Sequence, residues 1–140
     1  MNRPATLAAA IVARLGTQRF SMPFVPERAY APVVSLEQLK GLKVVVAPLS
    51  REVEMADRGD DYDTLEVTVW ILKRVAVTTL GEQDQVADLA DEIQKFLRRL
   101  QIDGFSWVGI NHSLAIPHYL QNHNVYGSAI TTRYKELVEC

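Results

Sequence analysis

The stretch VVVAPLSREVEMADRGDDYDTLEVTVWIL (residues 44–72) decides the fold, because two strand patterns flank a charged reversal of the chain. Residues 43–49 form a short run rich in β-branched side chains, bounded by Gly41 and Pro48. This pattern predicts a strand buried on both faces. Residues 51–63 are polar and charged, which predicts an extended hairpin arm. Residues 65–72 alternate between apolar and polar side chains, so they predict a second strand with one apolar face.

The other face of this second strand turns apolar at Trp70 and Leu72. An apolar face needs cover, either from a helix or from a neighbouring subunit. Trp70 fits two interpretations, because aromatic rings in strands pack inside a sheet in many proteins and anchor an interface in others. The residues leave both interpretations open.

Upstream of this stretch, the sequence predicts a helix and a linker. Residues 4–17 place apolar side chains at helical spacing behind a proline that suits the first turn. The prolines at positions 23, 26 and 32 exclude a continuous helix or a central strand, so an extended linker follows. Ser35 and Gln38 have the spacing of a capping box, which predicts one short helical turn that ends at Gly41.

Downstream, residues 82–100 form the most regular pattern of the chain. Acidic side chains occupy the first turn and basic ones the last, as the helix dipole favours. The apolar side chains recur as a single stripe, which predicts an amphipathic helix packed on one face of the sheet. The stripe consists of Val86, Leu89, Ala90, Ile93, Phe96, Leu97 and Leu100.

The last third of the chain predicts two antiparallel strands joined around LQNHN. The first strand spans residues 105–110 and 114–118 and is expected to break or bulge near Asn111. The second spans residues 125–134. We therefore predict an α+β fold: a mainly antiparallel sheet of about four strands, an N-terminal helix, a long amphipathic helix packed on the sheet, and an extended charged hairpin.

Length and composition favour one domain over residues 1–140, in which residues 1–34 form the N-terminal helix and proline-rich linker and residues 35–140 the α+β core. The chain has no apolar run of about 18 residues, so we expect no membrane contact and no signal peptide. Its single cysteine, Cys140, excludes an intrachain disulfide and a thiolate metal site. The net charge of −2 comes from 15 basic and 17 acidic residues without a basic block, which argues against tight DNA binding by the monomer.

The chain contains side chains that could carry chemistry, but their spacing does not favour a site. His112, His118 and His123 match neither the helical nor the strand spacing of metal ligands. The serines at positions 106, 113 and 128 lie in no nucleophile elbow, and no phosphate-binding loop is present. We expect no catalytic residue, no cofactor and no metal.

One alternative uses the acidic residues of the hairpin. Asp57, Asp60, Asp61 and Asp63 could ligate a hard cation together with a histidine, as in a metal-dependent hydrolase. The cluster lacks the spacing and the final bidentate glutamate of a calcium loop. A solvated hairpin tip explains it better.

Three stretches carry a resemblance to a known family: SLEQLKGLKVVVAPLSREVEMADRGDDYDTLEVTVWILKRV (residues 35–75), DQVADLADEIQKFLRRL (residues 84–100) and YGSAITTRYKEL (residues 126–137). Their order, and phrases such as DYDTLEV, resemble the small neck proteins of tailed bacteriophages. The closest group is that of tail terminator or tail-completion proteins. The resemblance covers nearly the whole chain, from the N-terminal helix to Tyr134.

This resemblance implies a structural virion protein that forms a ring of six copies. The ring would cap the tail tube, stop its polymerisation and offer a docking face to the head-side connector. Its partners would be itself and those two proteins, and DNA would pass through the ring without specific binding. It would lie at the head–tail junction, after assembly in the host cytoplasm.

Two alternatives to the terminator remain: a head-completion or stopper protein of the same neck, and a generic cytoplasmic adaptor. For a ring, the charged arm and the partly apolar strand are the expected contact surfaces, because charges set register and partner choice. The expected interface residues are Arg51, Glu52, Glu54, Arg58, Asp60, Asp61 and Trp70.

Overall fold

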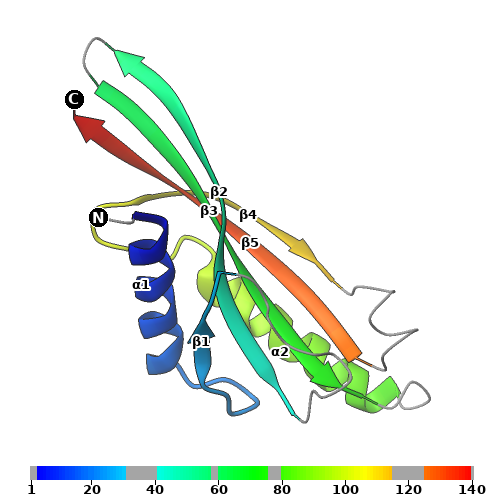
Figure 1. Cartoon of the computed structure of the whole chain (residues 1–140). Helices are drawn as coiled ribbons and strands as arrows, with labels where there is room; N and C mark the ends of the chain where they lie inside the picture. Colours follow the sequence, from blue (N-terminus) through cyan, green and yellow to red (C-terminus); the bar gives the residue numbers. More distant parts are fainter. Residues whose placement is uncertain (1–2, 31–40, 58–59, 76–79, 115–124, 140) are drawn as a thin grey trace.

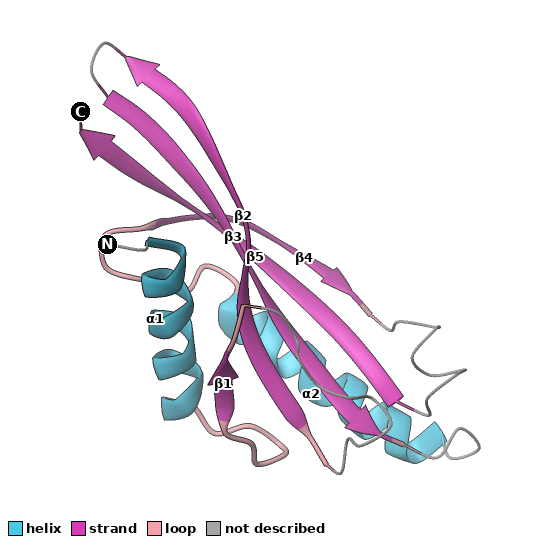
Figure 2. Cartoon of the chain, in the orientation of Figure 1, coloured by secondary structure: helices cyan, strands magenta, loops and turns pink. Residues whose placement is uncertain are grey.

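The computed structural model describes residues 3–30, 41–57, 60–75, 80–114 and 125–139. Within these ranges the chain forms two helices and five strands (Figures 1 and 2). In chain order they are α1 (Arg3–Thr17), β1 (Pro26–Arg28), β2 (Lys43–Asp57), β3 (Asp60–Arg74), α2 (Leu80–Leu97), β4 (Ser106–Ser113) and β5 (Val125–Glu139).

The strands form one sheet in the order β1-β2-β3-β5-β4. Only the pairing of β1 with β2 is parallel, and the other three pairings are antiparallel. The three central strands each have 15 residues and end at the same level, because Asp60 lies opposite both Asp57 and Glu139. The sheet is therefore long and narrow.

Both helices contribute to one apolar core. From α1 come Leu7, Ile11 and Leu15, which recur every four residues and are at most 1% exposed. The stripe predicted for α2 is confirmed from Val86 to Leu97, although Phe96 is only half-buried. The helix ends at Leu97 and not at Leu100, which is buried beyond its end. These side chains pack on the odd-numbered residues of β3, such as Val67, so burial of one sheet face positions both helices.

The strand predicted at residues 43–49 is buried on both faces as expected, since Val44, Val45, Val46 and Ala47 are each at most 3% exposed. It does not stop there, because β2 continues to Asp57 as one side of the charged hairpin. On the face of β3 away from the helix side chains, Thr68 and Leu72 are buried and Trp70 is half-buried. No described helix packs there in the core cluster.

Two sequence predictions need correction. The proline-rich linker contains β1, which raises the number of strands to five. Pro26 is tolerated because β1 lies at the edge of the sheet, where one N–H group is dispensable. The expected break near Asn111 is also wrong, because Asn111 pairs regularly with Thr131. The irregularity lies between Trp107 and Gly109 instead.

Some predictions fall outside the described residues. These are the short helical turn after Ser35, the LQNHN connection and residues 115–118 of the predicted penultimate strand. Leu114, which begins that second part of the strand, is described and lies just after the end of β4.

Candidate assembly interface

Three strands continue past both helices and form an extension of the sheet (Figures 1 and 2). We define the extension as residues 51–63 and 135–139. Apart from the pair of Lys135 with Ser106 of β4, its outer edges are unpaired within the described structure, because β1 reaches β2 only up to Val46 and β4 reaches β5 only up to Lys135. A narrow sheet segment without a covering layer presents both faces and both edges to partners.

Two ion pairs close the apolar core at the base of the extension. The carboxylate of Asp63, whose residue is 3% exposed, accepts a hydrogen bond of 2.9 Å from Nε of Arg51. Beside it in the register, Glu136 accepts one of 2.9 Å from Nε of Arg3. This hydrogen bond raises the pKa of Arg3. The guanidinium of Arg3 also lies 4.8 Å from the centre of the Phe105 ring, so α1 is tied to β5 and to the segment before β4.

Apolar side chains are exposed along the hairpin strands. Leu49, Val53 and Tyr62 are 57%, 60% and 38% exposed. The ammonium group of Lys135 lies 5.6 Å from the centre of the Tyr62 ring, a cation–π contact across β5 and β3. Exposed apolar groups among charges are typical of surfaces that become buried on association.

The structure places the predicted interface residues in three situations. Arg51 is half-exposed although it pairs with Asp63, Glu52 is exposed, and Trp70 is half-buried on the face of β3 away from the helix side chains. Glu54, Asp60 and Asp61 belong to β2 and β3, but their side chains lie outside the described part, as does all of Arg58. Their role as contacts stays a prediction.

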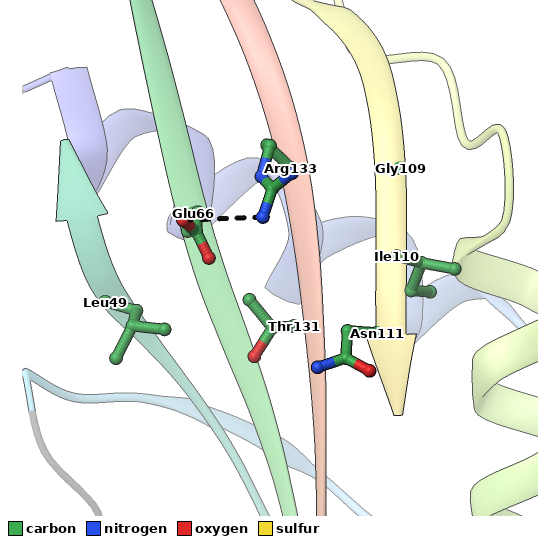
Figure 3. Close-up of a pocket in the computed structure, with 7 residues that line it drawn as sticks. All are labelled: Leu49, Glu66, Gly109, Ile110, Asn111, Thr131 and Arg133. Carbon is green, nitrogen blue, oxygen red and sulfur yellow. Dashed lines mark ion pairs between the residues drawn. The ribbon is translucent and has the colours of Figure 1, made fainter. Parts of the chain in front are cut away.

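A groove of about 360 Å³ lies on the sheet face shown in Figure 3. An ion pair of 3.7 Å between Arg133 and Glu66 crosses it from β5 to β3. Two irregularities open the groove: β2 shifts its register around Leu49, and Gly109 of β4 carries no side chain. Sequence reasoning missed this groove, and its only local signal is the pair of Pro48 and Gly109.

One histidine and one serine meet, but in a buried place. Nε2 of His112 lies 2.7 Å from Oγ of Ser128, whose hydroxyl donates to the carbonyl oxygen of Ser113 at 3.1 Å. Nε2 therefore donates its proton to Ser128. Burial lowers the pKa of His112, against an opposing effect of Asp91. Because Ser128 is fully buried, the contact fastens β4 to β5 rather than presenting a nucleophile.

The described residues contain no group of three or more His, Cys, Asp or Glu side chains that could hold a metal ion. His118 and His123 lie outside them, as do the side chains of Asp57, Asp60 and Asp61. Among the helices described, none combines the length and the apolar character needed to cross a bilayer.

A buried tyrosine joins the end of α2 to the sheet. The hydroxyl of Tyr134, on β5, donates to the carbonyl oxygen of Leu100 at 2.7 Å, and burial raises the pKa of this tyrosine to about 12. Trp107 of β4 donates from Nε1 to Thr132 at 3.2 Å. The part of β5 up to Tyr134 is thus held by specific hydrogen bonds, whereas the extension presents open edges.

No protein-family model matches this chain. No curated protein matches it. Among solved structures, a chain of the structure titled "Virion of native gene transfer agent (GTA) particle" is 14% identical to this one, with a TM-score of 0.43. The alignment covers 99% of this chain and 90% of that chain. A likeness of this size carries no argument about function, which has to be inferred from the residues and geometry of this chain.

Proposed function

We propose that this chain is a structural virion protein of a tailed-phage-like particle and works as a tail terminator. In this role copies of the chain form a closed ring, of six subunits by resemblance to the family. The ring caps the tail tube, stops its polymerisation and receives the head-side connector.

The observation that carries the proposal is the uncovered extension of the sheet. Its exposed Val53 and Tyr62, and its unpaired outer edges within the described residues, are surfaces that association would bury. Charged residues such as Glu52 on an edge strand oppose indiscriminate strand pairing, so they favour one specific partner. A ring of identical subunits needs two different patches on each copy, and the extension supplies one that is distinct from the helix-covered body.

The resemblance in sequence supports the finer role, and the charge of the chain is compatible with it. Because the net charge is −2 and the chain has no basic block, little counterion release would favour binding of DNA as it passes through a ring. We propose that the protein acts without catalysis, cofactor or metal.

Two measurements test the ring and its role. Native mass spectrometry of the purified chain should give one closed oligomer, with six subunits as the expected number. Tails assembled without this protein should then be overlong in electron micrographs, because nothing stops the tube. Tails of normal length that fail to join heads would instead assign the stopper role. A chain that stays monomeric at high concentration would overturn the ring.

Calorimetry tests the hydrolase alternative separately. Titration with Mg²⁺, Mn²⁺ and Zn²⁺ should give no stoichiometric heat. Tight binding of one ion that is lost in a variant with Asp60→Asn and Asp61→Asn would revive a metal site at the hairpin.

A further inference from the structure

The extension and the rest of the chain carry opposite net charges. The extension holds three basic and eight acidic residues, which gives it a net charge of −5. The whole chain has a net charge of −2, so the remaining residues carry +3. Such an asymmetry within one small chain favours contact between the acidic part of one copy and a basic part of another.

Three arginines of the body lie where α2 ends beside α1. Five of the nine carboxylates outside the extension lie on α2 before Lys95, so they do not neutralise this end. Arg14, Arg98 and Arg99 are all exposed, and none of them pairs with a carboxylate among the described residues. Arg14 donates from Nη1 to the carbonyl oxygen of Gln101 at 2.8 Å, which fixes it beside the segment that follows α2.

Two grooves flank that segment. One of about 320 Å³ is lined by Arg14 and another of about 540 Å³ by Arg99, and both share Ile102 and Phe105. Asp103 also lines both and is the one carboxylate among their lining residues. Each groove therefore combines an apolar wall with a guanidinium, which suits a partner that presents carboxylates next to apolar side chains.

We infer that the extension of one copy docks on the body of the next copy at these two grooves. Glu52, an exposed carboxylate of the extension, meets Arg14 or Arg99, and Tyr62, which shares the sheet face of Glu52, covers an apolar wall. This inference rests on the proposed ring and names its two contact patches. The contact is head to tail, because the two patches differ, and such a contact closes into a ring when the rotation allows it.

The extension cannot serve its own body in this way. Its strands continue without interruption from the body, and β3 is paired on both sides from Asp60 to Leu72. A ladder of this length does not fold back on itself. In Figure 1 the three strands lead away from the two helices, so the described part of the extension points away from the body of its own chain.

Charge reversal on each patch tests the contact. One variant reverses the body, with Arg14→Glu and Arg99→Glu, and the other reverses one face of the extension, with Glu52→Lys and Glu54→Lys, two positions that alternate onto the same sheet face. Each alone should lose the ring in native mass spectrometry, with a subunit dissociation constant about tenfold higher or more. Mixed together, the two variants should form rings in which they alternate, because the unmodified patches meet each other at one junction and the reversed patches meet each other at the next. All four substitutions in one chain should restore the ring.

Arg19→Glu with Lys95→Glu is the matched control, because it changes the charge of the body equally at residues that line neither groove. It should keep the ring, and urea titration should show that all variants are folded. For the unmodified protein, raising the salt concentration should weaken assembly. Reversed variants that assemble normally, a control that fails as they do, or assembly insensitive to salt would overturn the contact and leave the ring standing. A monomeric unmodified protein would remove the ring itself.

Discussion

The three central strands have two different environments along their length. In the body, β2, β3 and β5 bury Val46, Val69 and Ile130 completely against the helices. In the extension no helix among the described residues covers them, and Val53 is 60% exposed. The hydrogen-bonded ladder is continuous, so the difference comes from what packs on the sheet and not from the strands. Stability is thus expected to reside in the body, and association in the extension.

The sharpest way to break this contrast is a pair of truncations, one in each region. Leu89→Ala removes a fully buried side chain of α2 and should lower the free energy of unfolding by about 2–5 kcal/mol, because it leaves a cavity. Val53→Ala in the extension should change it by less than about 0.5 kcal/mol. Urea titration of the two variants under conditions that keep them monomeric measures both values. Equal losses would show that the extension contributes to folding as the body does.

The ion pairs offer a second comparison, between a buried carboxylate and an exposed one. Arg51→Ala leaves Asp63 buried without its partner and should cost about 2 kcal/mol of unfolding free energy. Lys43→Ala breaks a pair with Glu27 in which both side chains are about half exposed, and should cost less than about 1 kcal/mol. Thermal unfolding of both variants decides this. An Arg51→Ala variant as stable as Lys43→Ala would mean that water reaches Asp63.

The bond between Tyr134 and Leu100 predicts a dependence on alkaline pH. Burial raises the pKa of Tyr134 to about 12 in the folded chain, whereas the pKa of a tyrosine in an unfolded chain is about 10. Both states keep the proton below pH 10, so this contribution is complete there, and it is lost as pH rises towards 12.

Tyr134→Phe should cost about 1 kcal/mol near neutral pH, from the lost hydrogen bond. It should also lower the alkaline loss of stability relative to the unmodified protein, measured by urea titration between pH 9 and 11. Tyr62→Phe is the control, because Tyr62 is 38% exposed on the extension. Parallel alkaline profiles for Tyr134→Phe and the unmodified protein would contradict the assignment.

The smallest effect is expected at acidic pH, from His112. Burial lowers its pKa below the value near about 6.5 of an unfolded histidine. Its contribution to stability is therefore present above pH 6.5, where both states are neutral, and declines as the pH falls because the unfolded chain binds the proton first. His112→Gln keeps a donor for Ser128 without titrating, so the decline between pH 7 and 5 should be shallower. An unchanged slope would place the titrating group elsewhere.

The body could be predicted well because its pattern is local. The stripe from Val86 to Leu97 specifies a helix by itself, and the alternation of β3 specifies which residues face the core. Burial of one face then requires that the helices pack on the sheet. Prediction from the sequence first fails at β1. Its three residues are too few to show a strand pattern, and its pairing with Val44 joins parts of the chain that are distant in sequence.

The candidate interface was harder to predict for the same physical reason. The charge of the hairpin is visible in its sequence, but the bond between Arg3 and Glu136 joins residues 133 positions apart. Likewise, one of the two grooves beside Gln101 is formed where α1, with Arg14, meets the segment after α2. Side chains gathered by packing leave no local spacing to recognise.

The uninterrupted pairing of β3 has a mechanical consequence. A pull along the strands on the hairpin of β2 and β3 loads the ladder between β3 and β5 in shear, so its bonds cannot open one after another as in a zipper. A slip by one residue would also turn Val67 and Val69 out of the core. The described strands of the extension are therefore tied to the body by this pairing and by the packing at its far end.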